Sequence, residues 1–243
     1  MENTPLTNLP GIKGIIFDYG GTIDSRGVHW SEVIWDGYCA AGIDIDKADF
    51  RDAYVYAERE LAKTRHILPH HNFLDLLRIK MRIELDRLTA DGKMPADSDG
   101  ALAEAVAQYC YRAARECVEE ARPVIEALYA RYPLVLVSNF YGNVESVLAD
   151  FDLRRYFGAI IESAVVGVRK PDPAIFGLGV EALGLAPDEV LVVGDSLRKD
   201  ILPAESLGCR TAWIKGKGWT ADEDAATHPS TISSLGDLLN VPL

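Results

Sequence analysis

Three aspartates lie where runs of apolar residues end, a position that suits them for chemistry. Asp18 follows the run 11–17, Asp195 closes the run 190–195, and Asp200 comes five residues later at the start of an expected helix. The carboxyl ends of parallel strands are where open α/β sheets hold their ligands. Three carboxylates in one crevice cannot stay ionised without a cation, and oxygen ligands beside a phosphate site select Mg²⁺ over zinc. The spacing therefore predicts a magnesium site formed by these aspartates.

Small and basic residues complete the predicted site. Gly20 and Gly21 come directly after the first strand end, where a glycine backbone can approach an anion and donate N–H groups to it. Ser138 and Asn139 end the next apolar run, and Lys170 stands in a proline-constrained loop that suits a phosphate or an aspartyl intermediate. A nucleophile, a metal cradle, hydroxyl and amide donors and a lysine are the components of phosphoryl transfer. The candidate catalytic residues are Asp18, Ser138 and Lys170, and the candidate substrate-binding residues are Gly21, Ser138, Asn139 and Lys170.

Each of these parts has a simpler explanation when it is taken alone. The pattern Asp-x-Gly-Gly after a strand also serves as an ordinary turn, and Lys170 could be a solvated loop lysine. Asp195 or Ser196 could be the N-cap of the following helix, a common role for both residue types. Only their combination at three strand ends favours phosphoryl transfer over these alternatives.

Alternating strands and helices are expected to position these residues. Short apolar runs rich in β-branched residues predict buried parallel strands at 11–17, 134–139, 158–163, 190–195 and 210–214. Helical patterns separate most of these strands, at about 122–131, 142–150, 172–184 and 199–207. This alternation gives right-handed βαβ units and a sheet that is covered on both faces. The predicted core is α/β, with a doubly wound, Rossmann-like parallel sheet.

A long interval separates the first two predicted strands. It contains about a hundred residues without a strand pattern, too many for a plain crossover. Four amphipathic stripes with helical spacing fill it, over 33–41, 50–61, 73–88 and 102–117. We predict an inserted α-helical cap domain at 26–118, and a core domain formed by 1–25 and 119–243.

Composition narrows the classes of protein to which the chain can belong. Of the 243 residues 48% are hydrophobic, a share that argues against intrinsic disorder. The net charge of −12 makes nucleic acid and membrane surfaces poor partners, because they are negatively charged as well. No apolar stretch approaches the roughly 20 residues of a membrane span, and the first residues show no secretory signal. The cysteines, which show no CxxC spacing, indicate a reduced, cytoplasmic protein; they are Cys39, Cys110, Cys117 and Cys209.

Taken together, the motifs resemble those of the haloacid dehalogenase-like (HAD) hydrolase superfamily with a helical, C1-type cap. Asp18, Ser138, Lys170 and the run Gly194-Asp195-Ser196 with Asp200 match the family's four motifs in order and spacing. The resemblance covers essentially the whole chain, although the cap matches only in type. It implies that Asp18 is a nucleophile that forms an aspartyl-phosphate, and that Ser138 and Lys170 hold the transferring phosphoryl group. It also implies Mg²⁺ bound by Asp18, Asp195 and the carbonyl of Gly20, with Asp200 supporting the site.

One position departs from the family pattern. Phosphatases of this family usually carry a second aspartate two residues after the nucleophile, where it protonates the leaving group and then activates water. Gly20 stands there in this chain. Loss of a general acid–base costs about 10²- to 10⁴-fold in rate, so good leaving groups would be affected least. Asp24 or His29 could substitute, or they could be a capping residue and a surface residue, respectively.

Four functions are therefore weighed. The leading one is a Mg²⁺-dependent phosphatase acting on a small phosphorylated metabolite, and the second is a catalytically silent protein that binds a phosphorylated ligand. A dehalogenase also lacks the second aspartate, but it would lack the metal-binding Gly194-Asp195 pair that this chain retains. A phosphonate hydrolase would need a cap lysine for a Schiff base, for which Lys63 and Lys80 are available, and it tends to have arginine in place of Lys170.

The cap is expected to supply substrate specificity by closing over the crevice. The candidate cap-facing groups are His29, Trp30, Arg65, His66, His70 and His71. The histidine cluster at 66–71 has no carboxylate or thiol partner at metal-ligand spacing, so a helix-boundary or substrate-facing role is favoured over zinc binding.

Overall fold

The computed structural model describes residues 9–241 and contains a six-stranded sheet in the order β3-β2-β1-β4-β5-β6. Every neighbouring pair of strands is parallel. The strands are β1 (Gly14–Phe17), β2 (Leu134–Ser138), β3 (Ala159–Glu162), β4 (Val190–Gly194), β5 (Arg210–Ile214) and β6 (Thr231–Ile232). The predicted strands are confirmed with ends moved by up to three residues, and only the two-residue β6 was not predicted. The first eight residues, on which the expectation about a secretory signal rests, lie outside the described residues.

Apolar side chains cover both faces of this sheet. Along β1, Ile15 and Phe17 point to the face covered by α4 (Ala101–Tyr129), while Ile16 packs on the opposite face with Ile175 and Phe176 of α7 (Ala174–Leu183). A strand buried on both sides must be apolar at every position, which explains why the strands read as continuous hydrophobic runs. The predicted doubly wound α/β core is therefore confirmed.

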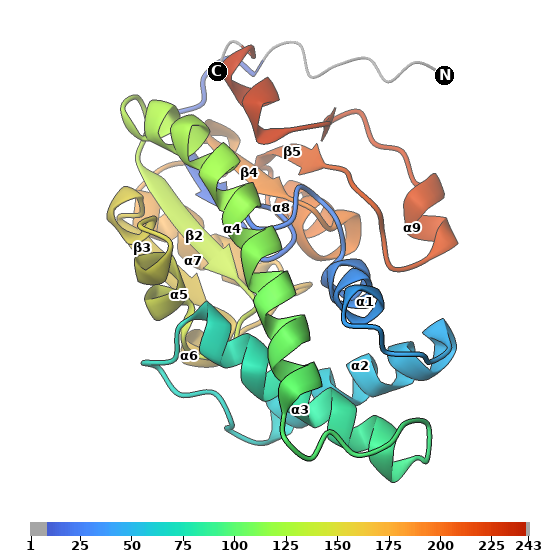
Figure 1. Ribbon diagram of the computed structural model, residues 1–243. Helices are drawn as coiled ribbons and strands as arrows, with labels where there is room; N and C mark the ends of the chain where they lie inside the picture. The colour runs from blue at the N-terminus through green and yellow to red at the C-terminus, as the bar shows by residue number, and fades with distance from the viewer. Residues whose placement is uncertain (1–8, 242–243) are drawn as a thin grey trace.

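The remaining helices divide between two regions. Three lie with the first part of α4 away from the sheet, where they form a helical bundle (Figure 1): α1 (Trp30–Ala40), α2 (Lys47–Lys63) and α3 (Phe73–Ala90). The others surround the sheet: α5 (Val144–Asp150), α6 (Ser163–Val166), α8 (Leu202–Ser206) and α9 (Ala221–Ala225), with short 3₁₀ or π turns η1 (Arg154–Tyr156), η2 (Pro187–Glu189), η3 (Leu197–Ile201) and η4 (Leu235–Leu239). The buried apolar residues of the bundle form its core, as the stripes predicted.

Helix α4 differs from the sequence-based expectation. The sequence indicates one helix over 102–117 and another from about 122, whereas the structure has a single helix of 29 residues with Pro123 inside it. In Figure 1 this helix runs from the bundle across the face of the sheet. The division into a core domain and a cap domain at 118 and 119 therefore falls within a continuous helix, and it stays a prediction.

No helix among residues 9–241 has both the length and the apolar character that a membrane crossing requires.

Candidate active site

A crevice of about 2010 Å³ lies between the carboxyl edge of the sheet and the helical bundle. Residues from both regions line it: Asp18, Ser138, Lys170 and Asp195 come from the sheet edge, and Tyr54 comes from α2. Because parallel strands all end at the same edge, residues far apart in the sequence meet here. The predicted site residues Gly20, Gly21, Asn139 and Asp200 line the same crevice.

The three aspartates predicted to bind a metal come together at this edge. Asp18, Asp195 and Asp200 each offer a carboxylate oxygen, and these oxygens lie within 4.8 Å of one another. The Nζ of Lys170 lies 2.6 Å from Oδ1 of Asp18 and 2.6 Å from Oδ1 of Asp200. Three carboxylates therefore face one buried ammonium group, which leaves the cluster short of positive charge.

Burial and mutual repulsion act on these groups. Burial raises the pKa of the Asp18 carboxyl above its ordinary value, against the lowering effect of Lys170. Burial and the neighbouring Asp200 and Asp18 hold the pKa of Asp195 well above its ordinary value. Burial opposes the charge of Lys170, but Asp18 and Asp200 keep its pKa above the usual range. A cluster of oxygen donors with excess negative charge fits a hard divalent cation such as Mg²⁺.

Two glycines allow the carboxylates to approach so closely. A Cβ atom on Gly21, whose φ is +97°, would lie 2.4 Å from the carboxyl group of Asp195. A Cβ atom on Gly194 would lie 2.4 Å from Cβ of Asp200. The N–H of Gly21 donates to Asp24 Oδ1 at 2.7 Å, so its predicted role in binding substrate has only its place in the crevice lining as support.

Asn139 holds the backbone of Lys170 in place. Its Nδ2 donates to the carbonyl of Lys170 at 3.1 Å, and its Oδ1 accepts from the N–H of Lys170 at 2.9 Å. The geometry thus gives Asn139 a positioning role, while contact with substrate stays a prediction. The next peptide bond, Lys170–Pro171, is cis. Ser138, at the end of β2, is buried and lines the crevice.

The sequence analysis missed two residues that orient the aspartates. The hydroxyl of Thr22 donates to Asp18 Oδ2 at 2.9 Å and lies 3.3 Å from Asp195 Oδ1. The indole N–H of Trp213, at the end of β5, donates to the carbonyl oxygen of Asp195 at 2.6 Å. A hydroxyl four residues after a candidate nucleophile could have been noticed, whereas the contact of Trp213 depends on the pairing of β4 with β5.

A model of the haloacid dehalogenase-like hydrolase family matches residues 12–208. The chain belongs to this family. Similarity to individual proteins supports the assignment. The chain is 31% identical over 106 residues to phosphoserine phosphatase of Thermus thermophilus, and the alignment covers 43% of this chain and 42% of that protein. It is 38% identical over 92 residues to glyceraldehyde 3-phosphate phosphatase of Pyrococcus furiosus, 37% and 38% of the two chains. It is 33% identical over 119 residues to the pyrimidine 5'-nucleotidase YjjG of Escherichia coli, 47% and 52%.

These alignments span about half or less of the curated relatives' lengths. The fold itself matches over nearly the whole chain. A dehalogenase with an intermediate complex superposes with a TM-score of 0.61 at 17% identity, covering 94% of this chain and 96% of the other. A HAD-superfamily hydrolase from Geobacter sulfurreducens superposes with a TM-score of 0.52 at 20% identity, covering 96% and 97%. The chain is therefore a HAD-like hydrolase by family and by fold.

In this HAD-like hydrolase there is open space at Gly20, the position where the family resemblance implies a second aspartate. A Cβ atom on Gly20 would have a single neighbour within 4 Å among the described residues, Nε1 of Trp30 at 4.0 Å. That indole N–H donates to Asp24 Oδ1 at 3.1 Å. A Cβ atom at position 20 would therefore meet no backbone atom within 4 Å apart from those of its chain neighbours.

Asp24 and His29, the two candidate substitutes for the missing acid, have structural partners. Asp24 Oδ1 accepts hydrogen bonds from Gly21 and Trp30, its Oδ2 is buried, and burial raises its pKa to about 7. His29 is the N-cap of α1 and accepts from the N–H of Ser31, and burial lowers its pKa to about 4. Asp24 braces the loop after β1, and His29 is half-buried rather than a surface residue. Their substitution for the acid stays a hypothesis.

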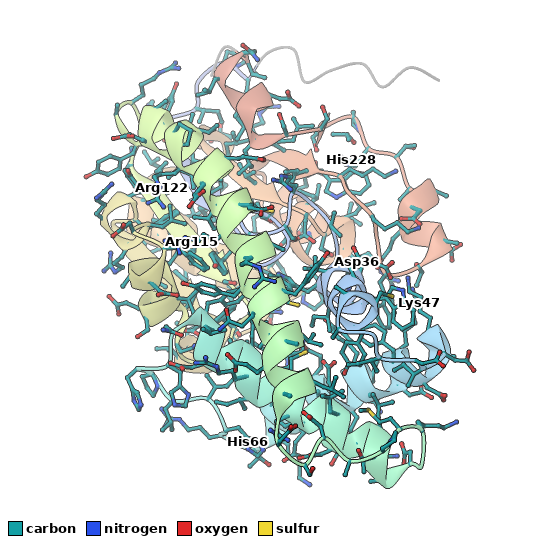
Figure 2. All side chains as sticks on the ribbon, viewed as in Figure 1. Asp36, Lys47, His66, Arg115, Arg122 and His228 are labelled. Carbon is teal, nitrogen blue, oxygen red and sulfur yellow. The ribbon has the colours of Figure 1, made fainter. Side chains whose placement is uncertain are left out.

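The histidines of the cap form no metal site in the part of the chain that the structure describes. There, the one group of three or more candidate ligands is Asp18, Asp195 and Asp200. His66 pairs with Glu60 at 2.9 Å and lies at the outer edge of the molecule (Figure 2), while His71 accepts the N–H of Leu68. A helix-boundary or substrate-facing role for these histidines stays a prediction.

Proposed function

We propose that this HAD-like hydrolase is a Mg²⁺-dependent phosphatase that acts on a small phosphorylated metabolite through an aspartyl-phosphate on Asp18. One observation carries the proposal. Asp18 lies at the carboxyl end of β1 with Oδ1 2.6 Å from Nζ of Lys170, in contact with Thr22 and beside Asp195 and Asp200. The relatives named as phosphatases make phosphate monoesters the substrate class of choice.

The reaction would proceed in two displacements at phosphorus. A carboxylate oxygen of Asp18 attacks, the bond from phosphorus to the leaving oxygen breaks, and that oxygen keeps the electron pair. Water then attacks the aspartyl-phosphate, which releases inorganic phosphate and restores the carboxylate. Lys170 and Ser138 would hold the phosphoryl oxygens, while Thr22 orients Asp18. Mg²⁺, held by Asp18, the Gly20 carbonyl and Asp195 with Asp200 behind them, would neutralise charge on the transferring group.

Gly20 limits which substrates react quickly. The leaving oxygen has no aspartate at position 20 to protonate it, so leaving groups that need little protonation should be preferred. Acyl phosphates and aryl phosphates are of this kind. This feature also favours the second candidate, a silent protein that binds a phosphorylated ligand without turnover.

The two remaining functions have less support. A dehalogenase is disfavoured by the Asp195 and Asp200 cluster, which a metal-free reaction would not need. For a phosphonate hydrolase, a Schiff base needs a neutral amine. Burial opposes the charge of Lys80, but Glu58 and neighbouring tyrosines keep the pKa of Lys80 well above its ordinary value, so it stays an ammonium. Lys63, the other lysine considered, is exposed.

The deciding experiment is hydrolysis of acetyl phosphate and p-nitrophenyl phosphate by the purified protein, with Mg²⁺ or with EDTA. Turnover that requires Mg²⁺ and disappears with EDTA supports the phosphatase. If the folded protein hydrolyses neither substrate, the second candidate, a silent protein that binds a phosphorylated ligand, is favoured instead. Cytoplasmic location and the absence of nucleic-acid and membrane partners stay predictions from composition.

A further inference from the structure

A second cluster of charged groups lies in the cap, apart from the aspartates. Glu58 of α2 and Lys80 of α3 form an ion pair, and the ammonium of Lys80 lies 4.2 Å from the ring centroid of Tyr54. The hydroxyl of Tyr141, in the loop after β2, donates to the two carboxylate oxygens of Glu58 at 3.0 and 3.1 Å. Three elements from two regions of the molecule thus converge on one carboxylate.

Burying charged groups such as these inside a helical bundle costs free energy of desolvation. The Lys80 side chain is 4% exposed, and Glu84 behind it is fully buried. Replacing buried ion pairs by apolar residues of similar volume is often neutral or stabilising, so packing alone gives no reason for these groups. A polar network of this kind inside a crevice wall is better explained by recognition of a ligand.

The cluster opens toward the crevice through Glu58. Tyr54, Glu58, Lys80 and Tyr141 all line the same crevice as Asp18. The side chain of Glu58 is 36% exposed, against 4% for Lys80, so a bound molecule has more access to Glu58 than to Lys80. Burial opposes the charge of Glu58, but Lys80 and Tyr141 hold its pKa below the usual range, so the carboxylate is ionised.

The charges around Glu58 select the group that it can bind. An ionised carboxylate only accepts hydrogen bonds, so the ligand must supply an N–H or O–H donor. Lys80 already compensates the charge of Glu58, and Lys199 also acts on it from the sheet edge. A ligand ammonium would be repelled by these two lysines, and a ligand carboxylate would be repelled by Glu58. A neutral donor avoids both repulsions, and a hydroxyl group is the simplest donor of this kind.

We propose that Glu58 determines substrate specificity by accepting a hydrogen bond from a hydroxyl of the leaving group, so that the preferred substrates are phosphate monoesters of neutral polyols. This inference rests on the proposed phosphatase function, since it places the phosphoryl group at Asp18 and the hydroxylated part of the substrate at Glu58.

The test compares polyol phosphates of three, four and six carbons with alkyl phosphates of equal chain length. Each is used as a competitor of acetyl phosphate hydrolysis in the presence of Mg²⁺. At least one polyol phosphate should bind about tenfold more tightly than its alkyl counterpart, and Glu58→Gln should reduce this ratio toward one. Glu60→Gln is the matched control, because Glu60 lies on the same helix but pairs with His66 instead of Lys80; it should leave the ratio unaltered.

Two results would overturn the proposal: equal inhibition by every matched pair, or a polyol preference that survives Glu58→Gln. If Glu58→Gln destabilises the protein by leaving Lys80 without its partner, the double variant Glu58→Gln/Lys80→Met removes the unpaired charge and should show the same loss of preference. If neither acetyl phosphate nor p-nitrophenyl phosphate is hydrolysed, the phosphatase assignment fails, and calorimetric Kd values for the same pairs still decide whether Glu58 selects hydroxyl groups.

Discussion

Two buried lysines in this HAD-like hydrolase lie among carboxylates, and their surroundings differ in charge balance. In the core, Lys170 faces Asp18 and Asp200, with Asp195 beside them, so negative charge exceeds positive charge. In the cap, Lys80 is paired with Glu58, and the second carboxyl nearby, Glu84, has a pKa raised by burial to about 7. The core cluster thus carries an excess of negative charge that a divalent cation would balance, whereas the cap cluster is close to neutral by itself. The excess charge agrees with the proposed metal-dependent chemistry, and the balanced pair agrees with the proposed role in recognition.

The largest effect is expected when the core cluster loses the carboxylate of Asp18, the proposed nucleophile. Asp18→Asn should reduce hydrolysis of acetyl phosphate by about 10⁴-fold, because the amide cannot form the aspartyl-phosphate. Steady-state kinetics with Mg²⁺ measures the change, and the unfolding midpoint shows whether the variant remains folded. Undiminished activity would mean that the phosphoryl group is not transferred to Asp18.

Placing an aspartate at position 20 should supply the core with a general acid and change which leaving groups are hydrolysed quickly. The Cβ atom that Gly20→Asp adds would have open space beside Trp30, and the variant should accelerate hydrolysis of alkyl phosphates by about 10²-fold or more. Acetyl phosphate, whose leaving group needs little protonation, should gain less. Gly20→Ala is the matched control for the added volume. Equal gains on both substrates would show that protonation of the leaving group does not limit the rate.

On the cap side, Glu84 should make stability depend on pH. Burial raises the pKa of Glu84 from 4.5 to about 7, so the unfolded state ionises first as the pH rises. The wild-type free energy of unfolding therefore falls between about pH 4.5 and pH 7 and levels off above it. Glu84→Gln lacks this loss, so it should gain about 2–3 kcal/mol relative to wild type between pH 5 and pH 8. Urea unfolding at both pH values measures this, and parallel pH profiles would contradict it.

The smallest effect is expected at Thr22. Thr22→Val keeps the shape of this buried residue but removes the hydroxyl that donates to Asp18. Turnover should fall about tenfold with little change in KM for acetyl phosphate, because the lost bond orients the nucleophile. A rise in KM at constant kcat would instead place Thr22 in substrate binding.

The sequence predicts the sheet well, because strands buried on both faces leave continuous apolar runs. It also predicts which polar residues lie at the strand ends, since parallel strands share one functional edge. It does not reveal that Asn139 braces Lys170, because that bond joins residues 31 positions apart through loop geometry. The pairing of Glu58 with Lys80 escapes notice for a similar reason, since the two residues lie on different helices that only tertiary packing brings together. A proline near the start of a helix is common, so Pro123 in sequence is equally compatible with a new helix there.

The order of strands in the sheet has a consequence for folding during synthesis on the ribosome. Strand β1, which ends directly before Asp18, pairs with β2 and β4, and both of these strands are made much later. At about 5–20 residues per second, synthesis takes roughly ten to forty seconds to proceed from Asp18 to Asp200. The helices α1 to α3 have nearby partners and can pack during this interval, while β1 still waits for both neighbours. Asp18, the proposed nucleophile, is thus among the first residues made, and the site around it is among the last parts to be assembled.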